Sequence, residues 1–299
     1  MLTDAAGLDL VYRGFQKLYT DAFLAAPAHG DKIAMKVASS GASEQYSWLG
    51  SFPAMREWVG PRVAGNLDVN TFTILNRSFE STVRVSRNHI LDDKIGVFAP
   101  VFQRMGINAR LHPEELIFGL LRNGFTGIGY DGQFFFDVDH PVIDPATEAV
   151  TLVSNTQAGA LPPWYLLDCS QAIKPLIWQE REPYTFEQQT SPGDDAVFNN
   201  NEFVYGVRAR VNAGYGLWQL AFGSRAALTA ANYAAARAAM MAFRSDTGRF
   251  LGIQPTTLVV PPALESDARG LLNTDIAPGG AASNVWRDSA ELIVTPFVA

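Results

Sequence analysis

The sequence predicts an α+β fold, and three observations lead to that prediction. Val, Thr, Ile and Phe are dense between residues 68 and 87 and alternate with polar residues, which is the two-residue period of a β-strand. Apolar residues between 91 and 123 recur instead at steps of three and four, which is the period of an α-helix. Short β-rich runs and further helical segments then follow in mixed order, with no repeat period.

The first part of the chain predicts a helix, a loop and a strand. Apolar residues between 4 and 26 lie at mostly helical spacing, which indicates an amphipathic N-terminal arm. Residues 46–65 are rich in Trp, Gly and Pro, and we expect them to form an ordered loop packed on another surface. In the strand that follows, one face carries Phe79, Val83 and Val85 and the other carries Glu80, Arg84 and Ser86.

Two helical segments are expected between residues 91 and 123. Pro100 should kink the first, because proline lacks an N–H and crowds the preceding turn. Pro113 should open the second, and Gly124 stands where a C-terminal cap belongs. The stripe of the first helix consists of Ile95, Phe98, Phe102, Met105 and Ala109, and that of the second of Leu116, Ile117, Leu120 and Leu121.

The second half predicts short strands, an alanine-rich helix and a closing strand. Thr229 is a good N-cap for a helix with eight alanines between 230 and 242, so this helix can pack closely against a neighbour. Residues 187–202 read as a polar loop. The expected strands lie around 149–153, 164–168, 174–180, 203–211 and 290–298.

Composition excludes several classes of protein. The net charge of -7 argues against a protein whose main task is to bind phosphate groups. Charged residues make up only 18% of the chain, so much of the surface is available for contact with other proteins. No apolar run reaches the length of a transmembrane helix, and the N-terminus lacks the pattern of a signal peptide, so we expect a protein of the cytoplasm without a membrane partner. Cys169 is the single cysteine, which excludes an intramolecular disulfide and any zinc site built from cysteines.

The stretch from Gly127 to Pro141, GIGYDGQFFFDVDHP, contains a possible nucleotide motif. Its first six residues, Gly127 to Gly132, fit the dinucleotide fingerprint G-x-G-x-x-G. That motif works where a strand enters the turn and a helix leaves it, whereas here a helix ends near Asn123 and QFFFDVD is expected to leave as a strand. The glycines are therefore better interpreted as turn residues, and no cofactor is expected.

The same stretch offers Asp137, Asp139 and His140 as a possible metal cluster. No second cluster closes a coordination shell, so we favour solvated or capping groups over metal ligands. No nucleophile elbow, Walker A loop or H-E-x-x-H motif is present, and Cys169 reads as a small buried apolar residue. We therefore expect no catalytic, cofactor or metal site, and His112 before Pro113 is expected only to cap a helix.

Several long segments, taken in order, resemble one family. From about Trp48 to Pro296 the chain is similar to the major head subunit of Mu-type phages, the T protein family. The first 45 residues share only a general arm-like character with it. The segments that carry the resemblance are WLGSFPAMREWVGPR, NRSFESTVRVSRNHILDDKIGVF, YDGQFFFDVDHPV, WYLLDCSQAIKPLIWQ, YGVRARVNAGYGLWQLA and QPTTLVVPPALESDARGLL.

The resemblance implies the Hong Kong 97 phage (Johnson) capsid fold and a division of the chain. It implies a major capsid protein of a Mu-like tailed phage, not an enzyme, that assembles into the pentamers and hexamers of an icosahedral shell around double-stranded DNA. Its expected location is the virion capsid, and the host cytoplasm during assembly. The implied segments are an N-terminal arm (1–45), an extended hairpin loop (46–88), a peripheral domain with a spine helix (89–211), an axial domain (212–285) and a C-terminal strand that returns to the peripheral sheet (286–299).

The resemblance also implies partners. The main partner of each subunit is a further copy of the same chain. Aromatic residues around an arginine, as in this sequence, are typical of interface anchors. A separate scaffold protein and a portal are expected during assembly, with a possible decoration protein and nonspecific contact with packaged DNA. The chain has five lysines, so a covalently cross-linked shell is not expected. The candidate contacts between subunits are Trp48, Phe52, Arg56, Trp58, Phe79, Glu80 and Arg84.

Two alternatives stay open on the sequence. An encapsulin-like compartment shell would share the fold and hold enzymes as cargo. A hydrolase or oxidoreductase would use the glycine turn at 127–132 or the group Asp137, Asp139 and His140.

Overall fold

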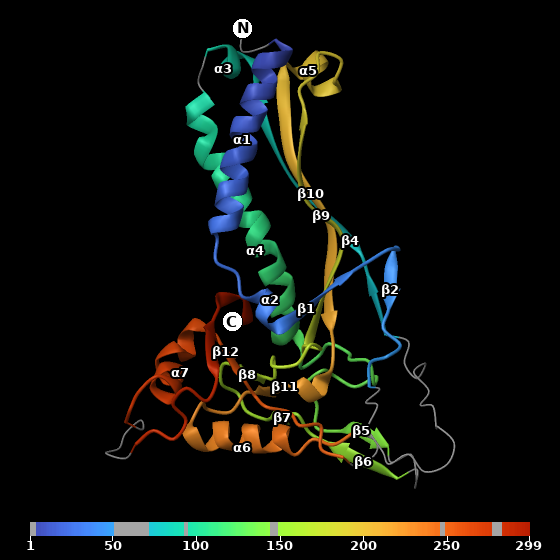
Figure 1. Cartoon of the computed structure of the whole chain (residues 1–299), viewed down its shortest axis with the longest axis vertical. Coiled ribbons are helices and arrows are strands. Elements are labelled where there is room, and N and C mark those ends of the chain that lie inside the picture. Colours follow the sequence, from blue (N-terminus) through green and yellow to red (C-terminus); the bar gives the residue numbers. More distant parts are fainter. Residues whose placement is uncertain (1–3, 51–71, 93–94, 144–148, 246–248, 277–282) are drawn as a thin grey trace.

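The computed structural model describes residues 4–50, 72–92, 95–143, 149–245, 249–276 and 283–299. Figure 1 shows an elongated upper part, in which two long helices lie along a long sheet, above a wider lower lobe of short strands and helices. None of the helices in the described ranges is long and apolar enough to cross a membrane.

The two long helices are α1 (Ala5–Ala25) and α4 (Ala99–Asn123), which lie against each other in the upper part (Figure 1). The expected N-terminal helix is thereby confirmed, and Asp4 caps it by accepting the N–H of Gly7 at 2.8 Å. A Cβ on Gly106 of α4 would lie 2.3 Å from the carbonyl oxygen of Tyr19, so the helices approach each other to a distance that only glycine allows.

The expected break at the two prolines is wrong. Pro100 lies in the first turn of α4, where the N–H that proline lacks would have no partner, so it begins the helix and does not kink it. Pro113 lies inside the same helix. One hydrogen bond is lost there, but Ala109 and Ile117 are buried on either side of Pro113, and this packing keeps the two halves in one helix.

The long sheet has four strands in the order β1-β9-β10-β4. The alternation expected for the strand before residue 87 is confirmed, because Val85 is buried while Glu80 and Arg84 on the other face are exposed. The strands are β1 (Ala34–Ala38), β9 (Leu176–Gln189), β10 (Glu202–Tyr215) and β4 (Arg77–Ser86).

The described residues form two apolar cores. The main core lies in the lower lobe and includes the adjoining ends of α4, β9 and β10. The second fills the space between this sheet and the two helices. The ring of Phe15 from α1 stacks on Phe102 from α4 with centroids 3.9 Å apart, and it meets Tyr205 of β10 edge to face at 5.2 Å. Aromatic contacts of this kind add to the burial of apolar area, so the arm is an integral layer of the upper part.

The lower lobe is built around a five-stranded sheet in the order β13-β12-β8-β11-β7. Its central strand β8 (Trp164–Leu167) is fully buried, as expected for a strand covered on both faces. The other strands are β13 (Glu291–Val294), β12 (Thr257–Val260), β11 (Ala221–Ser224) and β7 (Thr156–Gln157).

Helices α6 (Ala230–Met241) and α7 (Glu265–Leu272) flank this sheet in the lower lobe (Figure 1). The cap predicted at Thr229 is confirmed, because its side chain accepts the N–H of Asn232 at 3.2 Å. The polar loop expected at 187–202 is wrong in part, since it contains the end of β9 and a short helix, α5. The remaining helices are α2 (Gly30–Ile33), α3 (Arg87–Leu91), α5 (Asp195–Asn200) and the 3-10 segments Ile95–Phe98, Trp218–Leu220, Pro262–Leu264 and Pro296–Val298.

Two strand pairs stand apart from the sheets, β2 (Ser43–Gln45) with β3 (Thr73–Leu75) and β5 (His140–Ile143) with β6 (Val150–Val153). The strand expected over QFFFDVD is wrong, and so is the strand end expected at Pro141, because β5 begins at His140. Phe135 and Phe136 are both buried, and adjacent residues of a half-buried strand would point to opposite faces.

The expected domain boundary at residue 211 falls inside β10. The lower sheet also combines β7 and β8, which precede that boundary, with β11 and β12, which follow it, and β13 pairs with β12. The division of the chain into peripheral and axial domains therefore stays a prediction.

Candidate assembly surfaces

Phe79 and Glu80 line a groove of about 330 Å³ between β4 and α4. The Phe79 ring meets the His112 ring edge to face at 4.2 Å, and the guanidinium of Arg77 lies 5.4 Å from the centre of the same ring. The structure thus holds Phe79 against α4 and leaves it half-buried at the groove.

The expectation that His112 caps a helix is wrong, because His112 lies inside α4. Its Nδ1 lies 2.6 Å from the hydroxyl of Tyr184 on β9. Burial lowers the pKa of His112 from its ordinary value; the nearby carboxylate of Glu115 partly opposes this shift, and the positive charge of Arg77 adds to it. The neutral imidazole therefore accepts the hydrogen bond that the Tyr184 hydroxyl donates.

Arg84 points to the outer, solvent-facing side of the sheet and lies 3.7 Å from the carboxylate of Glu202 on β10. β4 is the edge strand of its sheet, and charged residues on an edge strand oppose uncontrolled pairing with other chains. Arg84 pairs with Glu202, and Glu80 accepts a hydrogen bond from the hydroxyl of Thr82, so both exposed charges have partners within the chain.

Trp48 is half-buried in its own chain, where it packs on the main core and meets Tyr46 edge to face at 6.2 Å. Phe52, Arg56 and Trp58 lie outside the described residues. Of the seven contact candidates, Phe79, Glu80 and Arg84 thus lie on β4, with Phe79 on the face toward α4 and Glu80 and Arg84 on the outer face.

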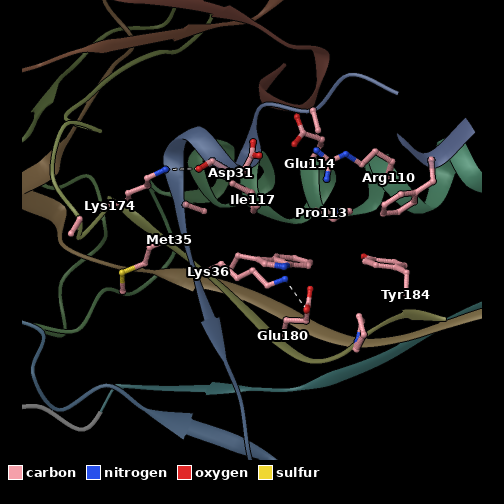
Figure 2. A pocket seen from close by; sticks show the side chains of 16 residues that line it. Asp31, Met35, Lys36, Arg110, Pro113, Glu114, Ile117, Lys174, Glu180 and Tyr184 are labelled. Carbon is pink, nitrogen blue, oxygen red and sulfur yellow. Dashed lines mark hydrogen bonds and ion pairs between the residues drawn. The ribbon is translucent and has the colours of Figure 1, made fainter. Parts of the chain in front are cut away.

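A larger cleft of about 730 Å³ lies between the arm, α4 and β9, and sequence reasoning missed it (Figure 2). Lys36 pairs with Glu180 at 2.8 Å, and the ammonium of Lys174 donates to the backbone carbonyl of Asp31. The carboxylate of Glu114, 4% exposed, accepts the N–H groups of His29 and Gly30. These contacts hold the end of the arm against α4 and β9.

Between the glycine turn and β5, a stretch that the structure describes throughout, no helix begins, so the strand–turn–helix arrangement of a dinucleotide site is not found there. Gly132 has a φ of 83°, which favours glycine, as expected for a turn. Gly127 is required for another reason: a Cβ there would lie 2.1 Å from the hydroxyl oxygen of Tyr215.

The suspected metal ligands have structural partners. His140 is fully buried, stacks on Trp218 with ring centres 3.9 Å apart, and places Nδ1 2.6 Å from Asp131 and Nε2 3.2 Å from Asn155. The carboxylate of Asp137 accepts the N–H groups of neighbouring residues, and its hydrogen bond to Asp139 raises the pKa of Asp139. Within the described part of the chain, no group of three potential ligands is close enough to hold a metal ion.

Cys169 is no activated nucleophile. Burial raises the pKa of its thiol to about 11, so the thiolate that reacts is disfavoured near neutral pH.

The chain is similar to known proteins over nearly its whole length. A family model described as Mu-like prophage major head subunit gpT matches residues 8–298. The major capsid protein of Escherichia phage Mu is 40% identical over 306 aligned positions, covering 100% of both chains. The Mu-like prophage FluMu major head subunit of Haemophilus influenzae is 38% identical and 96% of each chain is covered.

Solved structures agree with the sequence comparison. A subunit of the procapsid of bacteriophage JBD30 is 41% identical to this chain and superposes on it with a TM-score of 0.87. The superposition covers 98% of this chain and 99% of the JBD30 subunit. A chain of the JBD30 capsid is 30% identical with a TM-score of 0.79 and 94% of each chain covered. The fold is therefore that of phage capsid subunits, and the phage head is favoured over an encapsulin-like compartment. This chain belongs to the family of Mu-like prophage major head subunits.

Proposed function

We propose that copies of this chain assemble into the pentamers and hexamers of an icosahedral phage shell that encloses double-stranded DNA. The observation that carries the proposal is the match over nearly the whole chain to a procapsid subunit. Family membership makes the role structural, and we propose no catalytic activity, cofactor or metal.

We assign the contacts between subunits to the surfaces predicted from the sequence. Aromatic and arginine side chains dominate the energy of protein interfaces. Phe79 and Glu80 at the β4 groove support this assignment, because they combine a half-buried ring with an exposed charge. The proposed contact residues are Trp48, Phe52, Arg56, Trp58, Phe79, Glu80 and Arg84.

The proposed domain names follow the family pattern. The segment 46–88 would act as the extended hairpin loop, 89–211 as the peripheral domain, 212–285 as the axial domain and 286–299 as the returning strand. Figure 1 supports two structural regions, with the spine helix α4 in the upper part and α6 in the lower lobe.

The proposed partners are a scaffold protein and a portal during assembly in the host cytoplasm, and packaged DNA afterwards. A net charge of -7 suits a container that must not hold its genome tightly. A decoration protein is also proposed, because a JBD30 capsid chain similar to this one, with a TM-score of 0.77, comes from a capsid decorated with minor capsid protein trimers.

The test is coexpression of the chain with its scaffold protein, followed by sedimentation on a density gradient. We expect the wild-type chain to sediment as large particles. The double variant Phe52→Ala, Trp58→Ala should sediment as soluble subunits, with Phe198→Ala, at an 80% exposed position of α5, as the control that should still form particles. Particles of normal yield from the double variant would contradict the assignment of these contacts.

A further inference from the structure

We infer that neighbouring copies of this chain meet head to tail through two apolar patches on opposite sides of the lower lobe. The first patch is the β5–β6 groove, between the β5–β6 pair and the C-terminal end of α6. The second is the α7 turn, which we define as Ile276 and Val285 beside the end of α7. The inference rests on the proposed shell function, because it names the surfaces through which copies would join.

The β5–β6 groove has a volume of about 460 Å³ and a largely apolar lining. Val142 and Val153 form its inner wall and pack on the main core. Ala239, Ala242 and Phe243 of the α6 end line its other side. An apolar groove of this size, open to solvent, can receive one or two apolar side chains from a partner.

In an isolated subunit the β5–β6 pair exposes apolar side chains and unpaired strand edges to solvent. Its two strands pair only with each other among the described strands, so each has a free edge, and two-stranded sheets are marginally stable alone. Leu152 and Val150 share the outer face and are 64% and 57% exposed. A partner that covered this face would stabilise the pair and bury apolar area.

The α7 turn presents the complementary feature, exposed apolar side chains held in a fixed position. Val285 is 79% exposed and Ile276 is 57% exposed. The side-chain amide of Asn284, the neighbour of Val285, donates to the carbonyl oxygens of Leu271 at 2.8 Å and Thr274 at 3.0 Å. These hydrogen bonds hold Asn284, the neighbour of Val285, against the end of α7, so little conformational freedom is lost when Val285 enters a groove.

The placement of the two patches points to a second copy as the occupant. In Figure 1, α7 lies at one side of the lower lobe and the β5–β6 pair at the other, with α6 between them. Two different patches on opposite sides of one subunit produce a head-to-tail contact, which closes into a ring when the rotation between copies allows it. The exposed face of α6 between the patches carries the small residues Ala231, Ala235 and Ala238, which leave room for close approach.

Cross-linking tests the contact directly. Since Cys169 is the single cysteine, Cys169→Ser gives a thiol-free background for the pair Leu152→Cys and Val285→Cys. With a short bismaleimide reagent, assembled particles of the pair variant should give a ladder of linked subunits that ends at pentamer and hexamer. Each single-cysteine variant should remain monomeric on a denaturing gel, and so should the matched pair Leu24→Cys with Val285→Cys, because Leu24 is 74% exposed on α1 in the upper part.

A charge-pair experiment tests the energy of the same contact. Leu152→Asp alone and Val285→Asp alone should lose closed particles while urea unfolding of the subunit stays unchanged, because both side chains are exposed in the subunit. Leu152→Asp combined with Val285→Arg should recover particles, since opposite charges then face each other.

The outcomes separate this inference from the proposed function. Normal particles from Leu152→Asp, or particles of the cysteine pair that give no ladder, would overturn the head-to-tail contact while leaving the shell function intact. Normal particles that fail only to bind a decoration protein would overturn it too, and would assign the groove to that protein. Absence of particles from the wild-type chain with its scaffold would instead contradict the proposed function.

Discussion

The carboxylate of Glu114 in the middle of α4 accepts the backbone N–H of Gly30 at 2.6 Å, although 84 residues separate the two in the sequence. A second bond, from the N–H of His29 at 2.9 Å, uses the other carboxylate oxygen. These N–H groups lie at the start of the short helix α2, where they have no partner within the helix. Glu114 thereby ties the end of the N-terminal arm to the long helix.

Replacement of Glu114 by Ala should destabilise the subunit by roughly 2 to 4 kcal/mol, because the buried N–H of Gly30 and the partly buried N–H of His29 lose a charged acceptor. Urea unfolding followed by circular dichroism measures this change. The adjacent Glu115 is exposed, so Glu115→Ala is the matched control and should change stability by less than about 0.5 kcal/mol. Equal effects of the two substitutions would show that the buried bonds contribute nothing.

Gly106→Ala should push α1 away from α4. The added methyl group would lie 2.3 Å from the carbonyl oxygen of Tyr19, which is backbone and cannot rotate away. We expect a loss of about 1 to 3 kcal/mol from overpacking, and faster proteolysis of the arm. Gly119→Ala in the same helix meets nothing within 4 Å and should be neutral or stabilising by up to about 1 kcal/mol. A stable Gly106→Ala variant with a protected arm would refute the close helix contact.

Asn155→Ala should destabilise the lower lobe more than its size suggests. The buried amide of Asn155 donates to the carbonyl of Phe135 at 2.8 Å and accepts the N–H of Asp137 at 2.9 Å. Each orphaned group costs about 1 to 3 kcal/mol, so thermal unfolding should shift downward by several degrees. Asn200→Ala, at an exposed position of α5, serves as the control, and a shift no larger than that of the control would contradict the role of Asn155.

His112 should make subunit stability fall in mild acid. Its pKa is lowered by burial in the folded state, so the unfolded chain takes up the proton first as the pH falls. The stabilisation that the neutral, buried His112 gives the folded state is fully present above about pH 6.5, and it is lost as the pH falls through the pKa of His112 in the folded state. His112→Gln should therefore reduce the change in urea midpoint between about pH 7 and pH 5, whereas His89→Gln, at an exposed position, should leave it as in the wild-type chain.

Local patterns predicted most of the regular elements. The apolar stripes of α1 and of the first half of α4 and the alternation in β4 face the same core, so period alone identifies which side of each element is buried. The cap at Thr229 was also predictable, because it depends on residues of the same turn.

Contacts between distant segments could not be predicted in this way. The sequence does not show whether Glu114 or its neighbour Glu115 is buried. Only the contact with Gly30, which is distant in the sequence, makes Glu114 a buried hydrogen-bond acceptor. Pro113 was expected to begin a helix because local rules disfavour proline inside one, yet packing on both sides of it overrides that preference. From the sequence, His140 was a possible metal ligand. In the fold its ring instead stacks on Trp218 and its Nδ1 lies within hydrogen-bond distance of Asp131.

Negative-stain electron microscopy of the wild-type chain, coexpressed with its scaffold protein and purified, tests the central claim most directly. That claim is that the exposed apolar surface of the subunit is covered by further copies of itself. Closed, round shells of uniform diameter are the predicted result. A preparation that contains only compact monomers, with no rings, sheets or shells at any concentration, would contradict it.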